Sequence, residues 1–160
     1  MNAAKVDIGT PSSEFREWDT AEVRVHGFAD LPTTRGELVV SPEFKCLGNR
    51  WTLEIYPGGY ETSNDRNVAV YLRNMSDERI GKIKFVFHVW YESNKDVVYV
   101  ANEKMFDPYD NSGGDEGGND VWGSPNFYEH STIVKECLVD GTLTIEVRMR
   151  RKDRQTNTLA

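Results

Sequence analysis

SPEFKCLGNRWTLEIYP, from Ser41 to Pro57, is the stretch that decides the fold of this chain. A turn at Gly48-Asn49 precedes a strand in which apolar and polar residues alternate. Trp51, Leu53 and Ile55 fall on one face, and Thr52 and Glu54 fall on the other. This period-two alternation predicts a strand with one face in a core and one face in water. Such a strand needs a second sheet to cover Trp51, so the stretch predicts a two-layer β fold.

The rest of the sequence supplies strands for both layers. Apolar alternation or short apolar runs predict further strands at 22–28, 37–44, 67–74, 80–91, 97–100 and 143–150. We expect about eight short strands in all, because such runs recur at short spacing and no convincing amphipathic helix interrupts them. The pattern therefore predicts an all-β fold, an antiparallel sandwich.

Length, charge and cysteine content narrow the class of protein. The 160 residues suit one domain, and their net charge of −7 argues against nucleic-acid binding, which normally uses a basic face. No apolar run could serve as a signal-peptide core or membrane span, so we expect a cytoplasmic or nuclear protein with no membrane partner. Cys46 and Cys137 are too few for a disulfide scaffold. We expect two reduced, buried thiols, and a single bridge between them stays open.

Composition divides the chain into a flexible polar arm at 1–20, a domain at 21–151 and a polar tail at 152–160. Within the domain, residues 107–120 read DPYDNSGGDEGGND and predict a mobile loop, because they contain no apolar run. Carboxylates in this loop are of the kind that calcium prefers: Asp107, Asp110, Asp115, Glu116 and Asp120. Their spacing matches no calcium-binding loop, so a disordered insertion is the favoured interpretation and no cofactor or metal is predicted.

The sequence holds no recognisable catalytic motif. His26, His88 and His130 are far apart in the sequence, and none belongs to a metal-ligand pattern. No serine lies in a nucleophile-elbow motif. We therefore expect a protein that is not an enzyme.

Three separated segments together resemble the MATH (meprin and TRAF homology) domain. They are SPEFKCLGNRWTLEIYPGG, the pair NVAVYLRN and GKIKFVFHV, and WGSPNFYEHSTI followed by DGTLTIEVRM. The resemblance covers most of the chain and identifies residues 21–151 as a MATH domain. It implies an eight-stranded antiparallel sandwich of the TRAF-C type that binds short linear peptides in a shallow groove. MATH domains of this kind are often followed by a BTB domain that recruits a cullin ubiquitin ligase, which implies a substrate-recognition role in such an adaptor.

The resemblance also implies a set of peptide-binding residues. A family strand of the form Y-x-x-x-Y matches Asn67 and Tyr71, and the alternation places Arg73 on the same polar face. A phenylalanine of the next strand matches Phe85. The family's W-G-F motif matches Trp122-Gly123, with Ser124 in place of the second aromatic residue, and Asp120-Val121 replaces a Lys-Asp pair. These departures predict a peptide motif different from that of the well-studied receptors.

Two other functions remain open from the sequence. The aromatic face or the sheet edges could serve an oligomerisation or scaffold domain that contacts another folded protein. A calcium-dependent, lectin-like sandwich is the second alternative, and it depends on the acidic loop at 107–120.

Overall fold

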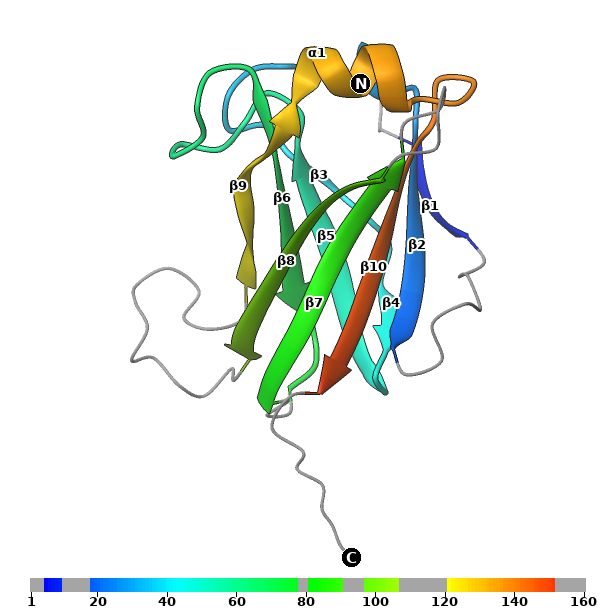
Figure 1. Cartoon of the computed structure of the whole chain (residues 1–160), viewed down its shortest axis with the longest axis vertical. Helices are drawn as coiled ribbons and strands as arrows, with labels where there is room; N and C mark the ends of the chain where they lie inside the picture. Colours follow the sequence, from blue (N-terminus) through cyan, green and yellow to red (C-terminus); the bar gives the residue numbers. More distant parts are fainter. Residues whose placement is uncertain (1–4, 10–17, 78–80, 91–96, 107–120, 152–160) are drawn as a thin grey trace, which may run out of the picture.

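Two antiparallel sheets of five strands each pack face to face in the computed structural model, which describes residues 5–9, 18–77, 81–90, 97–106 and 121–151 (Figure 1). Sheet A has the strand order β1 (Lys5–Gly9), β2 (Asp19–His26), β10 (Leu143–Arg151), β7 (Gly81–Trp90) and β8 (Val97–Phe106). Sheet B has the order β3 (Val39–Val40), β5 (Asn49–Tyr56), β6 (Asn67–Asn74) and β9 (Val121–Glu129), and β4 (Phe44–Cys46) also pairs with β5.

Helical turns occupy one end of the sandwich. A 3-10 turn, η1 (Phe28–Asp30), follows β2. After β9 the chain forms α1 (His130–Thr132) and a π-helical turn, η2 (Ile133–Cys137), which lie across the end of the strands in Figure 1. None of the helices in the described residues is long and apolar enough to cross a membrane.

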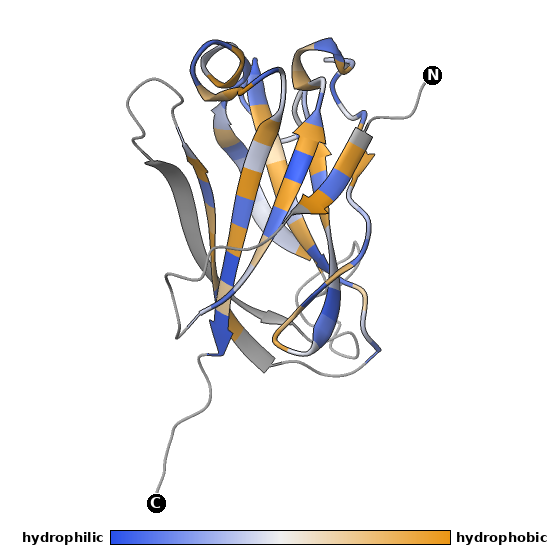
Figure 2. Ribbon diagram, turned by 90° about the vertical axis from the view of Figure 1, so that its right-hand side faces the viewer, coloured by the Kyte–Doolittle hydropathy of each residue, from blue (hydrophilic) through white to orange (hydrophobic). Residues whose placement is uncertain are grey.

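The core lies between the sheets and confirms the predicted all-β sandwich. Trp51, Leu53 and Ile55 of β5 are fully buried, and the Trp51 indole nitrogen donates a 2.9 Å hydrogen bond to the carbonyl oxygen of Cys46. Strands β7 and β10 contribute the facing layer: Ile83, Phe85, Phe87, Leu143, Ile145, Val147 and Met149. Figure 2 shows the apolar and polar bands that alternate along these strands, the pattern expected when each strand has one face in the core.

Several details differ from the sequence prediction. The predicted flexible arm contains a strand, β1, which pairs with β2. The predicted strand at 37–44 divides into β3 and β4 around Pro42, a residue with no backbone N–H to donate to a ladder. Strand β9 also falls outside the predicted strand ranges, and with these changes the described residues contain ten strands. The turn before β5 is centred on Leu47-Gly48, where both residues have positive φ. Strand β8 extends to Phe106, beyond the predicted end at residue 100.

The second face of β5 is buried, whereas the sequence predicted that it would be exposed to water. Thr52 and Glu54 are only 5% and 7% exposed. Glu54 is paired with Arg73 of β6, a long-range contact that the alternation of a single strand does not record. Cys46 and Cys137 are both buried and unbonded, as expected for reduced thiols.

Candidate peptide-binding face

The outer face of sheet B brings together residues from four strands. Val40 of β3 is the Cα partner of Glu54 in β5, Glu54 is the partner of Tyr71 in β6, and Tyr71 is the partner of Gly123 in β9. Because paired residues of antiparallel strands share a face, this row crosses the whole sheet. Val40 is 48% exposed, so the row begins with an apolar side chain at the surface. We call this surface the β6 face.

Three tyrosines form a cluster on the β6 face. The ring centroids of Tyr56, Tyr60 and Tyr71 lie 5.0 to 5.9 Å apart in edge-to-face arrangements. Tyr56 is buried, whereas Tyr60 and Tyr71 are half-buried. Edge-to-face contacts of this kind add to the stability gained by burial of the rings. The cluster therefore holds Tyr60 and Tyr71 in place while part of each ring stays accessible.

The hydroxyl groups of Tyr56 and Tyr71 stay protonated at neutral pH. Burial, with a smaller contribution from the charge of Glu54, raises the pKa of Tyr56 to about 12. Burial also raises the pKa of Tyr71. A neutral phenol both donates and accepts a hydrogen bond, so the cluster offers apolar rings together with polar groups.

Next to the cluster lies an ion pair. Arg73 Nε donates a 2.5 Å hydrogen bond to Glu54 Oε2, and their side chains are 38% and 10% exposed. The guanidinium thus compensates the charge of a carboxylate that is nearly removed from water. Because the two charges cancel locally, this part of the β6 face is polar without a strong net charge.

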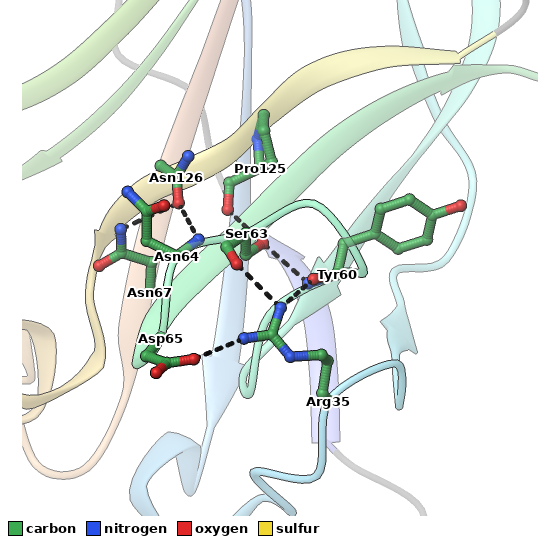
Figure 3. A network of polar contacts seen from close by, with 8 residues as sticks. All are labelled: Arg35, Tyr60, Ser63, Asn64, Asp65, Asn67, Pro125 and Asn126. Atoms are coloured by element: carbon green, nitrogen blue, oxygen red, sulfur yellow. Dashed lines mark hydrogen bonds and ion pairs between the residues drawn. The ribbon is translucent and has the colours of Figure 1, made fainter.

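A network of hydrogen bonds positions the loop that carries Tyr60 (Figure 3). The Arg35 guanidinium donates to the carbonyl oxygens of Tyr60 at 2.6 Å and Ser63 at 2.9 Å, and it pairs with Asp65 at 3.0 Å. Ser63 Oγ accepts a hydrogen bond from the Tyr60 N–H at 2.8 Å and donates to the carbonyl oxygen of Pro125 at 2.5 Å. The loop is thereby tied to both residue 35 and strand β9.

Asn67 belongs to the same network. Its side-chain amide donates at 3.0 Å to Asn126 Oδ1, which also accepts the Asn64 backbone N–H at 2.7 Å. The sequence analysis placed Asn67 on the face of Tyr71 as a peptide contact. In the structure Asn67 is half-buried and one visible role is to join β6, β9 and the loop.

Gly123 lies where β9 approaches β6 most closely. A Cβ atom at this position would stand 2.1 Å from the Val70 carbonyl oxygen and 2.6 Å from the Tyr71 Cα atom. Only glycine fits this approach, so the position is a packing requirement beside Tyr71. Ser124 is half-buried, and its Oγ accepts a 3.2 Å hydrogen bond from the Asn126 N–H.

Trp122 is one of the few large apolar side chains at the surface of the described residues, with 41% of it exposed. Its Cα partner is Leu72, and it lies on β9, the last strand of sheet B in the described order. It therefore lies at the sheet edge on the face of Leu72, and the structure does not bring it onto the β6 face with Tyr71.

Phe85 does not belong to this face, and the prediction that it contacts a peptide is wrong. Its side chain is fully buried, and it lies on β7 in the other sheet. Its ring packs at 5.3 Å from the Phe87 ring. The alternation of β7 turns both phenylalanines into the core, out of reach of a ligand. Asp120 and the acidic loop at 107–120, with the proposed calcium ligands, lie outside the described residues.

The sequence analysis missed Tyr56, Tyr60, Glu54 and Arg35 as parts of the site. Tyr56 and Glu54 share a face of β5 through the same alternation that identified the core, so that signal was available. Tyr60 and Arg35 lie in loops, and no periodicity connects them. In the part of the chain that the structure describes, no three His, Cys, Asp or Glu side chains are placed to hold a metal ion.

Comparisons with known proteins agree with this architecture. The chain is similar in structure to TRAF5 from Notothenia coriiceps, with a TM-score of 0.62 and 12% sequence identity over 86% of this chain and 76% of that chain. At this identity the likeness shows the fold alone. No curated protein matches the chain in sequence. A sequence model of the MATH domain matches residues 20–149, most of the chain, which therefore belongs to the MATH domain family, a family of protein–protein interaction domains.

Proposed function

We propose that this MATH domain binds a short, extended segment of a partner protein across the β6 face. The observation that carries the proposal is the tyrosine cluster, in which Tyr71 of β6 and Tyr60 of the adjoining loop present partly accessible rings. Aromatic residues are enriched at interfaces because they supply a large apolar area at a low entropic cost. A sheet with a terminal strand also suits an extended ligand, whose alternate side chains can point toward the protein.

The proposed contacts divide by chemistry. Tyr60 and Tyr71 cover an apolar side chain of the ligand and donate phenol hydrogen bonds. Arg73 offers a guanidinium whose charge Glu54 already compensates, so it favours polar over strongly acidic ligand groups. Gly123, Ser124 and Asn67 support the geometry. The affinity is expected to be weak to moderate, because a short peptide buries little area and loses conformational freedom on binding.

A peptide selection tests this proposal. A phage-displayed peptide library is selected on the wild-type domain and on Tyr71→Ala and Tyr71→Phe, with Val139→Ala as a control for an exposed apolar side chain outside the face. A short motif enriched by the wild type and by Val139→Ala, lost in Tyr71→Ala and weakened in Tyr71→Phe is the expected result. A motif that survives in Tyr71→Ala would place binding elsewhere on the molecule. No enrichment at all would favour a contact with another folded domain.

The finer proposal is that the domain selects substrates for a cullin-type ubiquitin ligase through a BTB domain. The resemblance of three sequence segments to MATH domains that are followed by a BTB domain supports this proposal. Such a role requires a cytoplasmic or nuclear location. The test is co-purification of the natural full-length protein with a cullin, with the same protein lacking any BTB segment as the control. Absence of a cullin from both preparations would refute the adaptor role and leave peptide binding intact.

A further inference from the structure

Strand β1 lies outside the region that the family model matches, yet it forms the edge of sheet A. Residues 5–9 pair with β2 through five Cα pairs, from Lys5↔His26 to Gly9↔Glu22, whereas the family match begins at residue 20. A MATH domain limited to the matched region would have β2 at this end of the sheet. The edge of β2 is therefore a place where an extended segment can be added.

The side chains of β1 fit the edge in an alternating pattern. Val6 and Ile8 are half-buried and pack against the core, opposite the fully buried Val25 and Val23. Asp7, between them, is held by two cationic or donor groups: Arg24 Nε lies 2.6 Å from Oδ1, and His26 Nε2 lies 2.7 Å from Oδ2. The edge of β2 thus contacts an apolar residue, an acidic residue and a second apolar residue in succession.

A hydrogen bond to Thr142, at the end of the sandwich, orients the His26 side chain. Its Nδ1 atom lies 2.9 Å from Thr142 Oγ1, in the tight turn that precedes β10. Hydrogen bonds from His26 and Arg24 hold the pKa of the Asp7 carboxyl below its ordinary value. The edge therefore presents a preformed receptor for a carboxylate, built from residues of β2 and of the turn before β10.

In the described strand order, β1 lies at the edge of sheet A and pairs with β2 alone. It has five residues, and the side chains of Asp7 and Arg24 are 47% and 41% exposed, so water screens their ion pair. A short edge strand with half-exposed anchors can be displaced by a second segment that makes the same contacts.

We propose that the β2 edge is a second binding site, at which β1 is the resident strand and an extended segment of a partner protein is the alternative occupant. The matching segment carries Asp or Glu between two aliphatic residues, because Arg24 and His26 read the carboxylate and the flanking side chains cover Val23 and Val25. This site lies on sheet A, and it is distinct from the β6 face on sheet B.

The test uses the whole chain and a labelled peptide, AKVDIGT, which copies residues 4–10. Its control peptide is AKVKIGT. Asp7→Lys places a positive charge on β1 next to Arg24 of β2 and should weaken the pairing of the two strands, which frees the edge. Fluorescence anisotropy should then show that the Asp7→Lys chain binds AKVDIGT at least about tenfold more tightly than it binds AKVKIGT. The Asp7→Lys chain should also bind AKVDIGT at least about tenfold more tightly than the wild-type chain does. Addition of Arg24→Glu should reverse the preference between the two peptides.

Further variants keep the test decisive. Ile8→Thr weakens the resident strand without a charge change, and it replaces Asp7→Lys if that variant does not fold by circular dichroism. Tyr71→Ala should leave AKVDIGT binding unchanged, so failure at one site is distinguished from failure at the other. Equal binding of both peptides, or no binding to either weakened variant, would overturn the proposal. Dimerisation of the weakened chain without peptide capture would also overturn it, because the edge would then serve a second copy.

Discussion

At the scale of single residues, Gly123 is a position where the neighbouring backbone leaves no room for a side chain. Gly123→Ala places a Cβ atom 2.1 Å from the Val70 carbonyl oxygen, so β9 must move away from β6. We expect a loss of about 2 kcal/mol in the free energy of unfolding, the range typical of overpacking. Urea denaturation followed by tryptophan fluorescence measures it.

The neighbouring Ser124→Ala provides the matched control. It removes one acceptor of a 3.2 Å hydrogen bond and adds no atom, so its cost should stay below about 1 kcal/mol. Equal costs for both substitutions would show that the close approach at Gly123 is not a constraint on the fold.

Arg66 has a left-handed backbone that its side chain does not favour. Its φ is 68°, its side chain is exposed, and its carbonyl oxygen accepts the His130 N–H at 2.8 Å. Asparagine adopts this conformation more readily than arginine. Arg66→Asn should therefore raise the free energy of unfolding by about 0.5–1 kcal/mol.

The β-branched variant Arg66→Val gives the opposite sign, because valine is least tolerant of positive φ. Thermal melting of the three proteins at one pH compares them. If Arg66→Asn melted below the wild type, or Arg66→Val above it, strain at this residue would not limit stability.

Sequence alternation locates side chains in regular strands and fails in loops. It placed Tyr71 on the other face of its strand from Val70 and Leu72, and the half-buried position of Tyr71 in the structure agrees with this. The same alternation places Phe85 with Ile83 and Phe87, so the family analogy for Phe85 conflicted with a signal already present. Tyr60 enters the site through a turn after Pro57, where side-chain direction depends on contacts with Arg35 that are distant in the sequence.

At the scale of elements, the loop from Tyr60 to Arg66 depends on Arg35. Arg35→Ala removes hydrogen bonds to the carbonyl oxygens of Tyr60 and Ser63, at 2.6 and 2.9 Å. We expect faster amide hydrogen exchange in residues 60–66 and at least about fivefold weaker peptide binding, with a change in global stability under about 1 kcal/mol, because the bonds lie at the surface.

Arg35→Lys is the informative control for this loop. Lysine retains the charge near Asp65 but lacks the planar fork that reaches both carbonyl groups. It should restore little of the peptide binding. Full recovery with lysine would mean that charge alone organises the loop.

The elements themselves differ in how well the sequence predicted them. Strands β5, β6, β7 and β10 have long apolar alternation, so their existence and sidedness were readable. Strand β1 was assigned to a flexible arm because KVDIG is short and stands in a polar context. Its stability comes from partners in β2 rather than from its own propensity, and local sequence carries no record of those partners.

At the scale of the whole molecule, the class of fold followed from counting alternating strands, whereas their spatial order did not. Sheet A joins β2 to β10, residues more than a hundred positions apart, through the register Val25↔Leu143. The sequence of neither strand indicates that the other is its partner. The number of strands and the family resemblance were therefore the basis for predicting the sandwich. The site depends on the order of strands in the sheet, which only the structure provides.

Acid stability is a property of the whole molecule to which one half-buried histidine contributes. His88 of β7 is the Cα partner of Glu146, and its Nδ1 atom lies 3.9 Å from Glu146 Oε1, which also accepts hydrogen bonds from Arg148 at 2.5 and 2.9 Å. Burial, and then the charge of Arg148, lower the pKa of His88 from 6.5 to about 4. The folded protein therefore binds fewer protons than the unfolded chain between these two values.

The sign of the effect follows from this difference. The free energy of unfolding should fall as pH decreases from 6.5 toward 4, by at most about 1.4 kcal/mol per pH unit for this histidine. Burial lowers the pKa of His130 as well, which adds a slope of the same sign. Burial raises the pKa of Glu22 above its ordinary value of 4.5. Its titration therefore changes the free energy of unfolding in the opposite direction, in the pH range from 4.5 upward.

Urea denaturation at pH 7.0, 6.0 and 5.0 checks the prediction on the wild type, His88→Gln, His130→Gln and the double variant. Glutamine cannot gain a proton, so His88→Gln should remove the larger share of the loss between pH 7 and pH 5, and the double variant should remove nearly all of it. The measurement compares slopes, so a uniform destabilisation by either substitution does not obscure the result. A His88→Gln slope equal to that of the wild type would mean that His88 titrates in the folded protein as it does in the unfolded chain.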